Sequence, residues 1–274
     1  GDRTMLARSL MRSASRLLPP RAAAAPCGAR AMSAGPPKVT LRYFDSRGRA
    51  QGIRYALVDA QIDFKDDRVS LQNIISGNWF NLKADANISG PFGVLPVLHW
   101  DDFTLGQTEA IAGYLYHKLG HGEGLSLEQS AMSSALVSCA HQDVIVMCLQ
   151  VLNVVGTNPD LKDEQIQSAV QGCTVRMNGI LPRLDKLMGG KPYFLKDEPT
   201  MGDYCIYDAL DQCKLILGDT VLERYPSLTS FQDRMAARPN IQKYSTSGER
   251  PLFLTGAPQE ATILSKIHSV PKLG

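Results

Sequence analysis

The sequence predicts a fold in two parts, an α/β layer followed by an all-α domain. Up to residue 119, short runs of β-favouring residues alternate with helical patterns, whereas beyond residue 125 the apolar spacing is helical throughout. A glycine-rich stretch, 120–124, separates the two parts, and 274 residues are enough for two ordinary domains.

The α/β part is expected to hold four strands and two helices. Apolar and β-branched runs predict the strands, and apolar residues spaced three and four apart predict the helices. In chain order, the expected elements are a strand at 39–44, a helix at 48–60, a strand at 62–69, an irregular polar segment at 71–89, a hairpin over 94–105 and a helix that begins near residue 107. The order β-α-β, then β-β-α, fits a thioredoxin-like layer.

The all-α part is expected to contain one long helix followed by shorter ones. The helical patterns cover 127–155, 163–188, 200–217, 228–236 and 241–244. Pro182 should kink the second helix, and Thr200 with Asp203 three residues later has the form of a capping box. Residues 248–274 match no pattern and are treated as an appended tail.

Charge and composition exclude several classes of protein. Residues 1–31 hold six arginines and one acid, so the net charge of +2 comes from this segment and indicates no nucleic-acid partner. No apolar run is expected to span a membrane. The six cysteines include no C-x-x-C pair and are expected to be buried, inert thiols, and no metal site is expected.

The first 37 residues are expected to be a presequence or a disordered extension. Arg8, Arg12 and Arg16 recur every fourth residue in an acid-free stretch rich in alanine and serine, which resembles a mitochondrial presequence. Met32 would also serve as an ordinary start, just ahead of the first strand. The expected location is cytoplasmic, with mitochondria as the alternative.

Pro96 interrupts the apolar run that opens the hairpin. Because proline cannot donate a ladder hydrogen bond, it belongs on an edge, at a bend, or in a cis peptide after Leu95. A cis turn would leave a backbone edge free to bind an extended peptide. The following helix would present free N–H groups with Gln107 and Thr108 beside them, a seat for a carboxylate, and the Thr108 hydroxyl is expected to cap it.

The segments LPVL at 95–98, TLGQTEAI at 104–111 and Tyr114-Leu115 resemble the end of the glutathione-binding domain of soluble glutathione S-transferases. The resemblance implies that the Leu95-Pro96 corner pairs with the cysteinyl backbone of glutathione. It also implies that Gln107 and Thr108 hold the γ-glutamyl carboxylate, with Thr108 standing where the family usually has serine.

Tyr43 is expected to activate the thiol of glutathione. It ends the first strand, where its side chain would face the Pro96 corner, and a protonated phenol is a hydrogen-bond donor at neutral pH. The segment YFDSRGRAQ at 43–51 resembles "YFxxRGRAE" of sigma-type and "YWDIRGLA" of mu-type transferases, whose tyrosine has this role. The same resemblance implies that Arg49 contacts glutathione.

Two further contacts with glutathione are implied by the resemblance. Trp79 and Lys83 match a W-x-x-x-K segment that binds the glycyl end. Val94 stands where sigma-type enzymes often carry lysine, so that contact is expected to be absent. In the family an acid from the partner subunit reaches the γ-glutamyl amine, and Asp143 is the nearest candidate, although its spacing differs by about two residues.

The sequence therefore predicts a tyrosine-type, sigma- or mu-like glutathione transferase of detoxification type. It would have a thioredoxin-like domain at 38–120, an all-helical domain at 125–247 and a tail at 248–274. Glutathione is the expected co-substrate, with no other cofactor, and the expected assembly is a homodimer. The second substrate would be an apolar electrophile held by residues 136–149 and the tail.

Four alternatives compete with this prediction. A cysteine-type enzyme fails, because no cysteine occurs from Met32 through Ser138. A serine-type enzyme would use Ser46 instead of Tyr43. A non-catalytic protein, like the lens crystallins built on this fold, or a prostaglandin-type isomerase, stays open.

Overall fold

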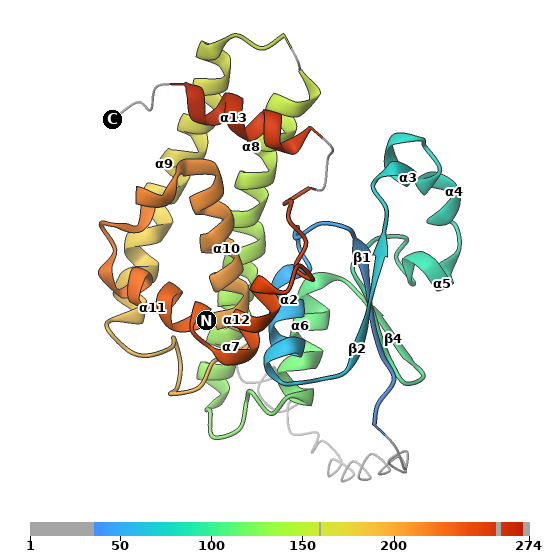
Figure 1. The fold of residues 1–274 in the computed structure, drawn as a ribbon. Helices are drawn as coiled ribbons and strands as arrows, with labels where there is room; N and C mark the ends of the chain where they lie inside the picture. The colour runs from blue at the N-terminus through green and yellow to red at the C-terminus, as the bar shows by residue number, and fades with distance from the viewer. Residues whose placement is uncertain (1–35, 159, 256–258, 271–274) are drawn as a thin grey trace, which may run out of the picture. The chain divides into compact units, whose positions relative to one another are not determined.

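A computed structural model describes residues 36–158, 160–255 and 259–270 (Figure 1). The expected presequence or extension therefore lies outside the described residues, except for its last two positions. Residues 37–274 form one compact unit.

The α/β layer is built on a four-stranded mixed sheet in the order β2-β1-β3-β4. β1 pairs in parallel with β2 and antiparallel with β3, and β3 pairs antiparallel with β4. The elements are β1 Val39–Phe44, α2 Gln51–Asp59, β2 Phe64–Val69, β3 Val97–Trp100, β4 Phe103–Gly106 and α6 Thr108–Lys118. This order confirms the predicted thioredoxin-like layer, although β2 and β3 begin later than the apolar runs suggested.

The segment between β2 and β3 is more regular than predicted. It contains three one-turn helices, α3 Gln72–Ile75, α4 Trp79–Leu82 and α5 Ala86–Ser89. They lie on the opposite side of the sheet from α2 and α6 (Figure 1). Helices of four residues leave little periodicity for a sequence pattern to reveal, which is why this segment looked irregular.

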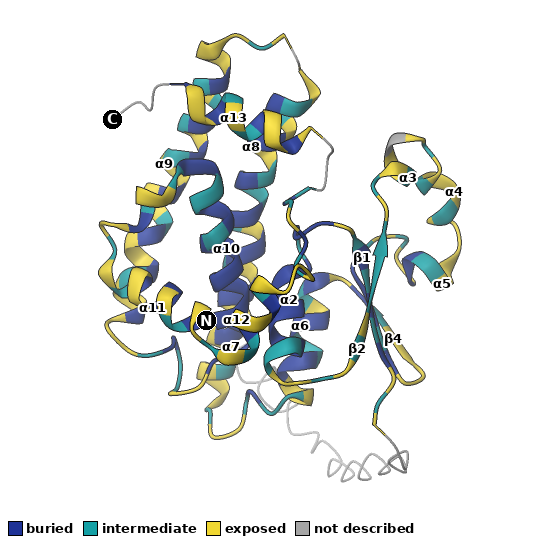
Figure 2. Ribbon diagram, viewed as in Figure 1, coloured by how far each residue is buried: buried dark blue, intermediate teal, exposed yellow. Residues whose placement is uncertain are grey.

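The all-α part is organised around α10, Met201–Leu217, whose first ten residues are all buried (Figure 2). Its N-terminus confirms the predicted capping box: the Asp203 carboxylate accepts hydrogen bonds from Thr200 N and Thr200 Oγ1, each at 2.8 Å, and from Phe194 N at 2.9 Å. The remaining helices are α7 Leu127–Ser138, η1 Cys139–Ile145, α8 Val146–Thr157, α9 Asp163–Met188, η2 Asp219–Leu222, α11 Pro226–Ala236 and α12 Pro239–Thr246.

The predicted long helix is present as α7, η1 and α8 in succession, with a π-helical turn in the middle. By length and composition alone, Leu127–Thr157 could cross a membrane, which the sequence prediction had not allowed for. Half of its most apolar window is buried inside the protein. The segment Leu127–Thr157 is a core helix of the all-α part, because its α7 and η1 portions pack against α10.

Two predictions about helix ends and the tail were wrong. Thr108 is the first residue of α6 and does not cap it; the N-cap residue is Gln107, whose φ is 73° and whose side chain makes no capping bond. The tail, expected to be an unassigned appendage, contains α13, Glu260–Ser269, which packs against α8, α9 and α10.

Candidate functional site

Three predicted site residues meet at one end of the sheet. The register sets Arg42 opposite Val97, and Val97 opposite Gly106. One position beyond this pairing lie Tyr43, Pro96 and Gln107. The peptide bond between Leu95 and Pro96 is cis. Of the three positions expected for this proline (a sheet edge, a bend or a cis peptide), the structure thus has the cis peptide.

The Tyr43 hydroxyl is directed at the loop between β1 and α2. Its oxygen accepts a hydrogen bond from Arg49 N at 3.1 Å, and only 7% of the residue is exposed. Burial raises the pKa of the phenol, while the Arg49 N–H and the Arg54 guanidinium, 5.9 Å from the ring, oppose that rise. The phenol is therefore protonated at neutral pH and keeps its own O–H available to donate.

Gly48 allows this close approach of loop and ring. Its φ is +39°, and a β-carbon placed on it would lie 2.5 Å from the Tyr43 hydroxyl oxygen. Gln212 on α10 donates from Nε2 to the Gly48 carbonyl at 3.0 Å. The β1–α2 loop is thus held by a hydrogen bond from α10 on one side and contacts the Tyr43 hydroxyl on the other.

Buried charges hold the same loop. The Arg47 guanidinium, 4% exposed, lies 3.3 Å from Asp208 and 2.5 Å from Asp211, both on α10. The Arg54 guanidinium, which is fully buried, contacts Asp66 and donates to the Ser46 carbonyl at 2.8 Å. No motif read from the sequence singled out these residues; the acids that pair with Arg47 lie more than 160 positions away in the chain.

α4 lies beside the end of β1. The Trp79 ring packs edge-on against Phe44, the neighbour of Tyr43, with 5.1 Å between ring centroids. Lys83 is exposed, and its ammonium lies 5.6 Å from the Phe80 ring centroid. An indole N–H and an exposed ammonium suit a carboxylate at the rim of a site.

The start of α6 supplies backbone donors at the same sheet end. Gln107 is exposed and Thr108 is 3% exposed. The first N–H groups of a helix have no intrahelical acceptor, so this end favours a bound carboxylate. Glu109 shares the first turn; burial opposes its ionisation, but a hydrogen bond from Gln142 Nε2 at 2.7 Å helps to lower the pKa of its carboxyl group.

His141, in the π-helical turn, lies against this region and was missed by the sequence interpretation. Its residue is 1% exposed, and its Nδ1 lies 2.9 Å from the Val137 carbonyl oxygen. Burial lowers the pKa of the imidazole, although the charge of Glu109 and the backbone of Arg49 oppose this. A neutral His141 thus packs next to the loop that contacts Tyr43.

The two remaining candidates are Ser46 and Asp143. Ser46 is 3% exposed, within the β1–α2 loop. Asp143 forms an ion pair with Arg176 of its own chain. The roles of Ser46 as an alternative thiol activator and of Asp143 toward the γ-glutamyl amine stay predictions.

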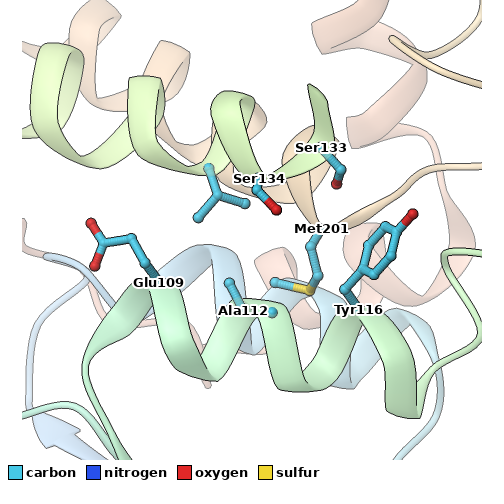
Figure 3. A pocket seen from close by; sticks show the side chains of 8 residues that line it. Glu109, Ala112, Tyr116, Ser133, Ser134 and Met201 are labelled. Carbon is cyan, nitrogen blue, oxygen red and sulfur yellow. The ribbon is translucent and has the colours of Figure 1, made fainter. Parts of the chain in front are cut away.

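A small cavity of about 50 Å³ lies between α6 and α7 (Figure 3). A space of this size holds a water molecule or two but no peptide. Its lining residues are Glu109, Ala112, Gly113, Tyr116, Ser133, Ser134, Val137 and Met201. Within the described residues, no group of three or more His, Cys, Asp and Glu side chains is placed to hold a metal ion.

Comparison with known proteins agrees with this geometry. A family model described as "Glutathione S-transferase, C-terminal domain" matches residues 151–248. The solved glutathione S-transferase of Ascaris lumbricoides superposes with a TM-score of 0.63 and 26% identity, covering 78% of this chain and 98% of that one. Residues 151–248 thus carry the glutathione S-transferase C-terminal domain, and the chain has the glutathione S-transferase fold.

Curated relatives include proteins of different named activities. The hematopoietic prostaglandin D synthase of Rattus norvegicus is 28% identical over 208 residues, which cover 76% of this chain and 95% of the relative. Glutathione S-transferase P 1 of Xenopus laevis is 29% identical over 78% of this chain and 94% of its own. S-crystallin SL11 of Nototodarus sloanii is 26% identical over 76% of this chain and 95% of its own length.

These relatives match only part of the chain. Each relative aligns over nearly its whole length, and each alignment leaves more than a fifth of this chain uncovered. The match to the C-terminal family model stops at residue 248, just ahead of the segment that leads to α13.

Proposed function

We propose that the protein is a glutathione transferase in which the Tyr43 hydroxyl stabilises the thiolate of glutathione for attack on an apolar electrophile. The observation that carries this proposal is the hydrogen bond from Arg49 N to the Tyr43 oxygen, at the sheet end shared with the cis Leu95-Pro96 corner. With that lone pair engaged, the phenol is oriented to donate its proton to sulfur.

The energy required matches one such hydrogen bond. A thiol of the cysteine type has a pKa of about 8.5, and lowering it by about two units needs roughly 2.7 kcal/mol of preferential thiolate stabilisation. A hydrogen bond to a charged group supplies about 1.5–3 kcal/mol. One well-placed phenol therefore provides most of the activation, and the reaction needs no step beyond attack of sulfur on carbon and loss of the leaving group.

Glutathione would extend along the sheet end. In this proposal the backbone beside Pro96 pairs with the cysteinyl residue, and Gln107 with Thr108 at the start of α6 binds the γ-glutamyl carboxylate. Trp79 and Lys83 bind the glycyl end, and Arg49 lies beside the thiol. We assign the enzyme to the sigma- or mu-like type on the segment that begins at Tyr43.

The direct test combines binding with kinetics. The purified protein should be retained on immobilised glutathione and eluted by free glutathione. It should then conjugate glutathione to a chloronitrobenzene, with a pH profile of kcat/KM whose apparent pKa lies well below that of free glutathione. Retention without any conjugation, over a panel of apolar electrophiles, would refute the transferase assignment.

A non-catalytic binding or structural role is the second candidate, and the enclosure of Tyr43 favours it. With 7% of Tyr43 exposed, a thiol has little access to the hydroxyl in this conformation. The crystallin relative carries a name of that class. Calorimetric titration separates the two: no binding of glutathione at millimolar concentration supports the structural role, whereas binding together with turnover supports the enzyme.

A glutathione-dependent isomerase of prostaglandin type is a variant of the same chemistry. The prostaglandin D synthase relatives support testing it. Incubation with glutathione and a cyclic endoperoxide, followed by product analysis, distinguishes isomerisation, in which glutathione is recovered, from conjugation, in which it is consumed.

We also propose a homodimer located in the cytoplasm, in accordance with the usual state of the family. Light scattering at micromolar concentration gives the mass of the assembly. Cell fractionation, with mass spectrometry of the amino terminus, distinguishes the cytoplasmic location from the mitochondrial alternative suggested by Arg8, Arg12 and Arg16.

A further inference from the structure

The C-terminal segment that follows α12 lies against the loop of the thiol-activating tyrosine. The carbonyl oxygens of Phe253 and Leu254 accept hydrogen bonds from Arg47 N at 2.8 Å and Gly48 N at 2.9 Å. Figure 1 shows this segment, drawn in red, passing close to the start of α2 on its way to α13. Two consecutive backbone N–H groups of the β1–α2 loop are thus satisfied by the tail.

Glu260, the first residue of α13, fixes the tail in this position. Its carboxylate is fully buried and accepts hydrogen bonds from Leu254 N at 2.6 Å, Thr255 N at 2.8 Å and Thr255 Oγ1 at 2.5 Å. A buried carboxylate with three donors is a costly arrangement to break, since removing it takes away the acceptor of the buried Leu254 N–H.

A second anchor lies closer to α12. Arg250 Nη1 is 3.3 Å from Asp211 and 3.3 Å from the Tyr55 hydroxyl. Asp211 also forms an ion pair with Arg47. The same carboxylate therefore contacts Arg250 of the tail and Arg47 of the β1–α2 loop. Two independent contacts, one of backbone and one of charge, therefore couple the tail to the same loop.

We propose that Glu260 is a positioning residue which, through the tail carbonyls at 253 and 254, holds the 47–49 loop where Arg49 N contacts the Tyr43 hydroxyl. This inference rests on the proposed function, because the hydroxyl so oriented is the one that activates glutathione. It assigns a role to a segment beyond the family match, which ends at residue 248.

The geometry explains why small movements would matter. The Arg49 N to Tyr43 oxygen distance is 3.1 Å, and hydrogen bonds weaken steeply beyond about 3.5 Å. Arg49 directly follows Arg47 and Gly48, whose N–H groups donate to the tail carbonyls. A shift of the loop by about half an ångström would therefore weaken the bond to the phenol while leaving the distant glutathione contacts in place.

The test compares the full chain carrying Glu260→Ala with wild type and with Gln259→Ala, an exposed neighbour whose side chain makes no capping bond. The first readout is the pH profile of kcat/KM for glutathione and a chloronitrobenzene. We expect the apparent pKa of the thiol to rise by about one unit in Glu260→Ala, with about fivefold lower kcat/KM near pH 6.5, because a rise from about 6.5 to about 7.5 lowers the thiolate fraction there from about one half to about one tenth. The KM for glutathione should stay within twofold, and Glu260→Gln should recover part of the loss.

The second readout is amide hydrogen exchange at residues 47–49, which needs no substrate. Faster exchange there in Glu260→Ala, but not in Gln259→Ala, is expected. Unchanged exchange and a superimposable pH profile, in a variant that is folded by circular dichroism, would overturn the proposal. If wild type shows no turnover at all, the proposed function fails, while the exchange measurement still decides whether the tail positions the loop.

Discussion

Replacing Tyr43 by phenylalanine removes one oxygen and leaves the ring that packs on Phe44. We expect kcat/KM for conjugation to fall roughly 10²-fold, which corresponds to a loss of about 2.7 kcal/mol of transition-state stabilisation. The affinity for glutathione should hardly change, because its carboxylates would be bound by other residues. The apparent pKa of the bound thiol should rise toward that of free glutathione.

The structure adds a stability cost to this variant. Arg49 N now donates to the phenol oxygen, and in Tyr43→Phe this donor loses its acceptor at a site where the tyrosine is nearly enclosed. An unpaired buried donor costs about 1–3 kcal/mol. Urea unfolding should therefore show a lower midpoint for Tyr43→Phe at pH 7, with an unchanged slope.

Tyr114→Phe is the matched control, since Tyr114 lies in α6 of the same layer and packs against Trp100 and Phe103. It should leave kcat/KM within twofold of wild type. If Tyr43→Phe also stays within twofold, the phenol does not activate the thiol. In that event, loss of activity in Ser46→Ala would indicate a serine-type enzyme instead.

Three further predictions follow from single positions. Gly48→Ala should lower kcat/KM at least tenfold, because the added carbon would lie 2.5 Å from the phenol oxygen; Gly113→Ala, where the added carbon meets nothing within 4 Å, should leave activity unchanged, and equal activities would contradict the packing argument. Burial lowers the pKa of His121 to about 4 from an unfolded value near 6.5, so the unfolded chain binds the extra proton and stability falls as the pH drops through this window. Between pH 7 and pH 5 the free energy of unfolding of wild type should fall by about 2 kcal/mol more than that of His121→Phe. The exposed His117→Gln is the control and should behave like wild type. Equal decreases in wild type and His121→Phe would refute this. Asp203→Ala should cost about 3 kcal/mol in urea unfolding, because Asp203 accepts three hydrogen bonds at the start of α10, and a loss below about 1 kcal/mol would show that the cap is dispensable.

The strands and long helices could be predicted because their information is local. Period-2 and period-3.6 patterns predicted the strands in their order along the chain and the helices α2, α6 and α9, whereas the order of the strands within the sheet comes from the structure. The capping box at Thr200 and Asp203 was found for the same reason, since both partners lie within one turn. The one-turn helices α3 to α5 were missed, because four residues cannot establish a period.

The candidate site was predicted only where a short segment carries it. The bend at Pro96 and the place of Tyr43 near the end of β1 are set by neighbours in sequence. The expected orientation of Tyr43 toward the Pro96 corner stays a prediction, since the structure gives its hydroxyl the Arg49 N–H as partner. By contrast, Arg47 finds its acids more than 160 positions away, and Glu260 acts on the loop through the tail. A side chain whose partner is that distant leaves no spacing to recognise.

The ion contacts of Asp211 with Arg47 and with Arg250 join a residue near the beginning of the described chain to one near its end. Contacts of such long sequence separation form late, after much loop entropy has been lost. During synthesis the α/β layer emerges from the ribosome first, and its strands can pair while the last segment is still inside the exit tunnel. The nascent chain is therefore expected to acquire a sheet early, and a fully ordered β1–α2 loop only once its final helix has been released.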